Sequence, residues 1–327
     1  MENDKIISHQ HASNKQASPI VAWRHLAAAL ALWLLLAYAG GVAASDGERL
    51  VALKATITVN NKGDMPISNY IHRVTIPADD PPRQQLLRID YPYGDSHTMA
   101  KHVNGVDRFM EFYWGIPPHS RLIREITFHL RLKPYDYQKD MSPKIAKPGH
   151  FFLDPSLYVE SNSPEVRRIA EPIRRSYADK ESQLRAAYMY PQLNLNYQNM
   201  ENKGALYAIR EGKGDCTEYA ALFVAISRSL GIPARLTSEF LFSKRNEFSW
   251  PNHHATEVYL DGRWIPVDPN LALEPSLGYG FGISATSKVT LKRDGSWTWS
   301  NQVPGVSRQY RENLMEVGMH WDIKEEN

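Results

Sequence analysis

The chain has 327 residues, and with 43% hydrophobic and 23% charged residues its composition is typical of a folded globular protein, not of a disordered one. This length is sufficient for two domains, each with its own hydrophobic core. The 38 basic and 36 acidic residues give a formal net charge of +2, so the charge balance does not indicate a nucleic-acid partner.

Residues 1–44 predict an export signal or an N-terminal membrane anchor. Arg24 and His25 precede an uncharged stretch rich in Leu and Ala, residues 26–44, which ends in the small residues typical of a signal-peptidase site before Ser45. Because this stretch approaches the length that spans a bilayer, an uncleaved anchor is the alternative. We therefore expect a periplasmic or secreted protein, attached to the inner membrane through residues 26–44 if the segment is retained.

Residues 45–148 predict a small antiparallel β-sandwich. Two stretches alternate apolar and polar residues with the period of a strand, and their apolar members are Leu53, Ala55, Ile57 and Val59 in the first and Ile126, Phe128, Leu130 and Leu132 in the second. Pro-rich separators lie between the shorter strand candidates of this region. The region has no chemical motif, and substrate docking, cell-surface contact and shielding of an active site are all compatible with it.

Residues 149–305 contain the reactive groups, and the only cysteine of the chain, Cys216, opens a predicted helix. Asp215 can cap this helix, and Glu218 can reach back to it in a weak form of the capping box. At the first helical position, unpaired backbone N–H groups and the helix dipole favour an anion, so they would stabilise a thiolate or an oxyanion. The apolar residues that follow predict a buried helix that ends at Gly231.

A hairpin is predicted downstream, because Asp261-Gly262 is a strong two-residue turn signal. Pairing outward from this turn places Asp268 opposite Ala255, and the alternation of side chains then puts His253 and Asp268 on one face. This arrangement predicts His253 as a general base and Asp268 as the acid that orients it. A bulge at Pro266 would change the register, and His254 is then the alternative base.

Cys216, His253 and His254 are also residue types that bind zinc. Adjacent residues of a strand point to opposite faces, however, and the chain has no second cysteine. We therefore expect no metal and no cofactor.

The last segment, residues 306–327, is rich in charged residues and predicts a tail with at most one terminal helix. The chain is thus expected to have four parts. They are the signal or anchor at 1–44, the β-sandwich-like domain at 45–148, the domain with the reactive groups at 149–305, and the charged tail at 306–327.

Three separated blocks of the 149–305 domain share a pattern with a known family. The blocks are Gly214-Asp215-Cys216-Thr217-Glu218-Tyr219-Ala220 with Leu230-Gly231-Ile232-Pro233-Ala234-Arg235, then Glu257-Val258-Tyr259 with Asp261-Gly262-Arg263-Trp264, and Val267-Asp268-Pro269. This pattern resembles the transglutaminase-like family of papain-type thiol enzymes. In that family the base stands four residues before the glutamate of the Glu-Val-Tyr run, which is His253 here. The family's aromatic residue two positions after the base is replaced by Ala255.

The resemblance covers roughly residues 152–275 and implies an α+β fold, with a buried nucleophile helix packed on an antiparallel sheet. It also implies that upstream residues, with Tyr197 and Gln198 as the candidates, help to line the oxyanion site. The small β-sandwich would precede this core.

Together with the predicted export signal, the resemblance indicates an exported thiol enzyme in which Cys216, His253 and Asp268 act as a triad through an acyl-enzyme. Water as the second nucleophile would make it a peptidase or amidase, and an amine would make it an acyltransferase. The expected partner is a protein or peptide substrate, such as one of the cell envelope. An amide-forming enzyme of natural-product biosynthesis and a non-catalytic peptide-binding module on the same fold are the alternatives.

Overall fold

The computed structural model describes residues 47–101, 106–242, 246–274, 277–293 and 300–326. The predicted signal or anchor at 1–44 lies outside these residues. Within the described ranges, no helix is both long enough and apolar enough to cross a membrane.

The β-rich part of the chain contains a five-stranded sheet with the strand order β11-β17-β1-β6-β3 and a four-stranded sheet with the order β16-β2-β5-β4. Their strands are β1 (Arg49–Asn61), β2 (Ile67–Ile76), β3 (Gln84–Asp90), β4 (Ser96–Lys101), β5 (Arg108–Ile116), β6 (Ser120–Leu132), β11 (Glu247–Phe248), β16 (Asn301–Gln302) and β17 (Met315–Glu326). Buried side chains of both sheets form one hydrophobic core cluster, so the sheets pack as a sandwich, in which β11, β16 and β17 come from outside the predicted range 45–148.

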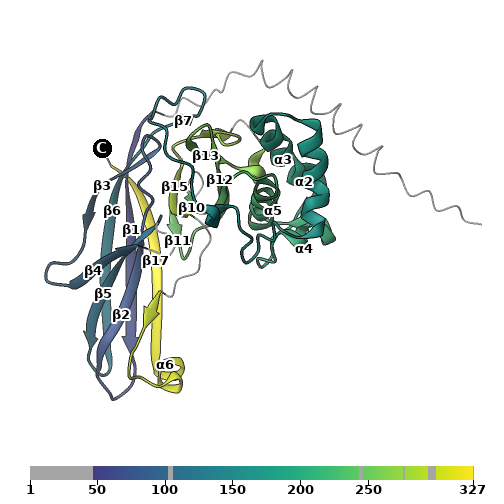
Figure 1. Ribbon diagram of the computed structural model, residues 1–327. Coiled ribbons are helices and arrows are strands. Elements are labelled where there is room, and N and C mark those ends of the chain that lie inside the picture. Colours follow the sequence, from purple (N-terminus) through teal and green to yellow (C-terminus); the bar gives the residue numbers. More distant parts are fainter. Residues whose placement is uncertain (1–46, 102–105, 243–245, 275–276, 294–299, 327) are drawn as a thin grey trace, which may run out of the picture. The chain divides into compact units, whose positions relative to one another are not determined.

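Strand β1 shows why the sequence folds in this way. Its buried and half-buried residues alternate along its length, and Leu53, Ala55, Ile57 and Val59 are completely or almost completely buried, as the period of two predicts. β1 pairs antiparallel with β6 on one side and with β17 on the other, and Figure 1 shows the three strands side by side. The prediction for this stretch is therefore confirmed.

The C-terminal segment corrects the prediction of a charged tail over residues 306–327. It forms helix α6 (Arg308–Leu314) and then β17, which pairs with β1 from Leu50 opposite Glu326 to Asn61 opposite Met315. Trp321 and Ile323 point into the core, while charged residues alternate with them toward solvent. Only one face of this strand is buried, so its sequence is rich in charged residues and does not have the apolar content expected of a core strand.

The second part of the chain is the α+β core that the resemblance implies. Its helices are α2 (Pro164–Ser176), α3 (Lys180–Asn194), α4 (Ala205–Glu211) and α5 (Cys216–Ser229), and its sheet has the order β13-β12-β10-β15 with β10 (Ala234–Leu241), β12 (His253–Leu260), β13 (Arg263–Val267) and β15 (Lys288–Arg293). Helix α5 packs against α2, α3 and α4 and also against β10 and β12 (Figure 1). Its residues from Thr217 to Arg228 are buried, as predicted for the nucleophile helix.

Short elements connect these layers. They are β7 (Tyr135–Asp136) paired with β14 (Ile283–Ser284), β8 (Asn196–Tyr197) paired with β9 (Lys213–Gly214), and the 3-10 turns η1 (His150–Phe152) and η2 (Pro269–Leu271). Phe240 and Val289 of the core sheet belong to the same hydrophobic cluster as the sandwich. The sandwich and the core sheet therefore pack directly on one another.

Candidate active site

The start of helix α5 fixes the position of Cys216. Asp215 Oδ1 accepts a hydrogen bond of 2.8 Å from the Thr217 N–H, and Glu218 Oε2 accepts one of 3.1 Å from the Asp215 N–H. The predicted capping box is thus complete, and Cys216 is the first residue of the helix. The side chain of Cys216 is partly exposed and its thiol is free of any disulfide. The thiol therefore belongs to a partly exposed residue at the start of a buried helix.

Glu218 does more than the sequence predicts. Its carboxylate is completely buried, and its second oxygen, Oε1, accepts hydrogen bonds from the N–H groups of Lys203 (2.8 Å) and Gly204 (3.2 Å). Burial raises the pKa of Glu218, and these backbone donors oppose the increase. The carboxylate joins the segment before α4 to the first turn of α5. Its position in the first helical turn predicts a cap but not this longer-range contact.

The hairpin of β12 and β13 has the register that the turn predicts. Leu260 pairs with Arg263 and Val258 with Ile265, and Pro266 stands opposite Glu257 without a shift in the ladder. A bulge at Pro266 is therefore not present. His253 Nε2 lies 2.7 Å from Asp268 Oδ2, and the two residues are only 5% and 2% exposed.

The environment of His253 and Asp268 favours an ion pair. Burial by itself would lower the pKa of His253, but the adjacent Asp268 carboxylate and the nearby Cys216 side chain raise it well above its ordinary value. Burial would raise the pKa of Asp268, but the His253 ring holds it below its ordinary value. Because Nε2 is bonded to Asp268, Nδ1 is the ring nitrogen that is left to contact the thiol. The structure thus brings Cys216, His253 and Asp268 together.

His254, the alternative base, points to a different place. Its Nδ1 lies 3.4 Å from Ser238 Oγ, and burial lowers its pKa. The side chains of His253 and His254 diverge, as expected for adjacent residues of a strand. Within the described ranges, no group of three or more His, Cys, Asp or Glu side chains could hold a metal ion.

Tyr197 and Gln198, the oxyanion candidates, lie beside the start of α5. Tyr197 pairs with Gly214 across β8 and β9, and the Gln198 N–H donates a hydrogen bond of 2.9 Å to the Gly214 carbonyl. Tyr197 is 56% exposed, and its pKa is raised by partial burial and by the nearby charge of Cys216. Both residues therefore lie beside the segment that leads into Cys216, and their part in binding an oxyanion stays a prediction.

Comparisons with known proteins agree with this fold. Residues 167–269 match the model of the Transglutaminase-like superfamily and so form a transglutaminase-like domain. A crystal structure of a candidate cysteine protease from Cytophaga hutchinsonii is 17% identical, has a TM-score of 0.57, and covers 86% of this chain and 92% of that chain. The periplasmic domain of TgpA from Pseudomonas aeruginosa is 14% identical with a TM-score of 0.36, covering 67% of this chain and 88% of that chain. A search of the curated proteins found no match.

Fold and comparisons together assign residues 167–269 the transglutaminase-like fold. The family match covers the nucleophile helix and the hairpin, and the likeness to the Cytophaga hutchinsonii structure shows that the fold extends over most of the chain.

Proposed function

We propose that the protein is an exported thiol enzyme that transfers or hydrolyses acyl groups at amide bonds of proteins or peptides. The observation that carries this proposal is the buried hydrogen bond of 2.7 Å between His253 and Asp268, with Cys216 near enough to raise the pKa of His253. A base that is hydrogen-bonded to an acid and lies near a partly exposed cysteine is the arrangement that activates a cysteine nucleophile.

The reaction begins when His253 takes the thiol proton and the Cys216 sulfur attacks the amide carbonyl carbon. A C–S bond forms, and the carbonyl oxygen takes the negative charge. When the tetrahedral intermediate collapses, the C–N bond breaks and His253 returns the proton to the leaving amine. Water or a second amine then attacks the thioester, and His253 takes its proton and passes it to the leaving sulfur. Asp268 keeps the imidazole in the required orientation throughout.

The oxyanion would be bound at the start of α5. The backbone N–H of Cys216 lies at the end of the helix where partial positive charge accumulates. Tyr197 and Gln198 lie on the adjacent β8–β9 segment and are the candidates for a second donor. Burial of His253 and Asp268 removes the pair from bulk water, which strengthens its electrostatic effect on the sulfur.

We further propose that the protein acts in the periplasm or outside the cell, on a protein or peptide such as one of the cell envelope. The apolar stretch at 26–44 and the small residues before Ser45 support export. Retention of residues 26–44 would attach the enzyme to the membrane.

The first test is the reactivity of Cys216. At mildly acidic pH, about pH 5 to 6, iodoacetamide should alkylate Cys216 much faster than it alkylates a free thiol, since His253 supports the thiolate. His253→Ala should abolish this advantage, and His254→Ala, which alters the neighbouring ring, should retain it. Equal rates for the wild type and a free thiol would contradict the proposal and favour a non-catalytic binding module.

A second test separates hydrolysis from transfer. Peptides of the cell envelope are incubated with the protein, with and without a primary amine, and the products are identified by mass. Cleaved peptides in water alone indicate hydrolysis, whereas an amine adduct indicates transfer. Cys216→Ser should form neither product.

A further inference from the structure

The β-sandwich contacts the strand of the catalytic base on both sides of His253. Upstream of His253, β11 joins the sandwich sheet by pairing Phe248 with Trp321 of β17. The Phe248 ring is buried and lies 5.1 Å from that of Phe240 in β10. The segment that leads into His253 is therefore fixed to the sandwich.

Downstream of His253, an arginine of the sandwich reaches the same strand. Arg83 precedes β3, and its guanidinium donates hydrogen bonds to both Asp80 and Glu257. The opposite oxygen of the Glu257 carboxylate accepts from Arg235 of β10, at 2.7 Å from Nε and 2.6 Å from Nη2. The side chains of Arg83 and Glu257 are only 12% and 3% exposed. A buried carboxylate of β12 is thus shared between one arginine of the core and one of the sandwich.

A second contact of the same turn extends the core sheet. The side-chain amide of Gln84 donates to the Thr290 carbonyl (2.8 Å) and accepts from the Thr290 N–H (2.9 Å), as a neighbouring strand would do for β15. Thr290 Oγ1 and Lys288 Nζ in turn contact Glu239, at 3.3 Å and 2.8 Å. Glu239 stands opposite His253 in the pairing of β10 with β12. Polar contacts therefore run from the sandwich to the strand of the base.

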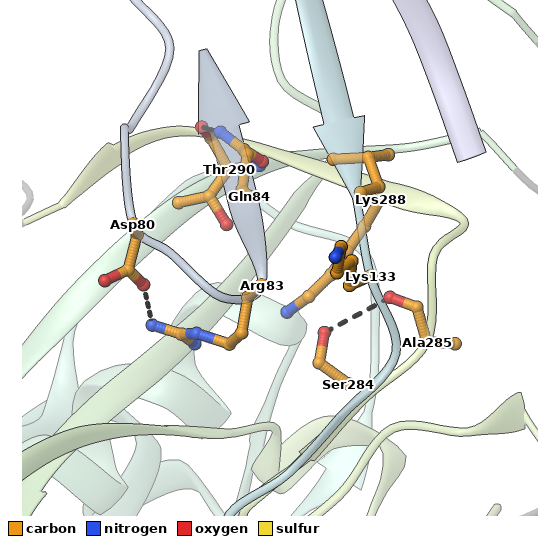
Figure 2. A pocket seen from close by; sticks show the side chains of 9 residues that line it. Asp80, Arg83, Gln84, Lys133, Ser284, Ala285, Lys288 and Thr290 are labelled. Atoms are coloured by element: carbon orange, nitrogen blue, oxygen red, sulfur yellow. Dashed lines mark hydrogen bonds and ion pairs between the residues drawn. The ribbon is translucent and has the colours of Figure 1, made fainter. Parts of the chain in front are cut away.

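Figure 2 shows this junction, with Thr290 beside Gln84 and with Asp80 joined to Arg83. The cavity between them has a volume of about 20 Å³. That is room for one water molecule and not for a substrate. The junction is accordingly a packed interface whose polar groups have defined partners.

We propose that Arg83 is a positioning residue for the catalytic base, acting through Glu257. Glu257 and His253 are four residues apart on β12, so their side chains leave the same face of the strand. A guanidinium that bridges Asp80 and Glu257 fixes the position of the strand along its length, and with it the distance between His253 and Cys216. The inference rests on the proposed function, because it needs His253 to act on the sulfur.

The test compares Arg83→Met, Arg83→Lys and Arg124→Met by the pH dependence of Cys216 alkylation. Arg124 is a matched control, because it is another half-buried sandwich arginine, paired with Asp95 at 2.9 Å. Arg83→Met should lose about 10- to 100-fold of the alkylation advantage at mildly acidic pH, the effect expected from a displacement of about 1 Å at the site. Arg83→Lys keeps the charge and should recover part of it. Arg124→Met should match the wild type.

The outcomes separate the two proposals. If the wild-type thiol has no advantage over a free thiol, the proposed function fails. If the wild type has this advantage and folded Arg83→Met retains it, the positioning role of Arg83 fails. The role also fails if Arg124→Met loses as much of the alkylation advantage as Arg83→Met does. A purely structural role would lower the unfolding temperature of Arg83→Met and leave the pH profile unchanged. If Arg83→Met does not fold, Arg83→Lys decides, since a wild-type profile in that variant overturns the inference.

Discussion

Protonation of His72 is expected to destabilise the β-sandwich in acid. This residue lies in β2, is 1% exposed, and stacks on Trp114 with 5.9 Å between the ring centroids. Its Nδ1 lies 2.8 Å from the Tyr70 hydroxyl, while its Nε2 has no hydrogen-bond partner within the part of the chain that the structure describes. Burial therefore lowers the pKa of His72 from 6.5 to about 4.

The sign and size of the effect follow from this shift. The neutral ring is the form that the folded protein holds, so the stabilising contribution is complete above pH 6.5 and is lost as the pH falls toward 4. Each pH unit between the unfolded and folded pKa values corresponds to about 1.4 kcal/mol. The loss in the free energy of unfolding should thus reach about 2 kcal/mol at about pH 5 and about 3 kcal/mol at about pH 4.

The double variant Tyr70→Phe/His72→Phe isolates this contribution. Replacing both partners by rings of similar shape leaves no buried hydroxyl without a partner, so the variant should be close to wild type at neutral pH. Urea unfolding of both proteins from about pH 7 to about pH 4 gives the difference in the free energy of unfolding. This difference should change by about 3 kcal/mol in favour of the double variant. A difference that stays constant with pH would refute the reasoning.

Three further predictions concern the site and the sheet. Asp268→Asn should lower turnover on the order of 10⁴-fold by disturbing the imidazole of His253. Its loss of unfolding free energy should shrink as the pH rises through the raised pKa of His253, and a loss independent of pH would contradict this. Glu218→Gln should cost about 1–3 kcal/mol in thermal unfolding, since a buried acceptor of three N–H groups is altered. Trp321→Ala should lower the free energy of unfolding by about 3–5 kcal/mol, because Trp321 is buried. His320→Ala, on the exposed face of the same strand, should leave it almost unchanged, and equal losses for the two variants would argue against the buried face of β17.

The parts of the fold that the sequence predicts are those with a local signal. The alternation of β1 predicts its buried face, and the pair Asp215 and Glu218 predicts the start of α5. The turn at 261–262 predicts the register that brings His253 to Asp268, because each step of a hairpin ladder follows from the one before. In each case a few neighbouring residues determine the structure.

The contacts that the sequence does not predict join distant segments. Arg83 and Glu257 are 174 residues apart, and no spacing rule connects them. Glu257 nevertheless offered a signal, since it is a charged residue in a strand that is buried on both sides. β17 was missed for a different reason, because its charged residues outnumber the apolar ones that face the core.

The pairing of β1 with β17 has a consequence for how the molecule matures. Residue 50 lies beside residue 326, so the transglutaminase-like core lies in the sequence between two strands, β1 and β17, that pair in one sheet. Contacts between residues so far apart form late in folding, because a long loop must close first. β11 pairs with β17, so the segment that leads to His253 is attached to the same sheet. A chain cut before residue 315 would lose the pairing of β11 with β17 and would keep the contacts of Arg83 and Gln84 with the core sheet.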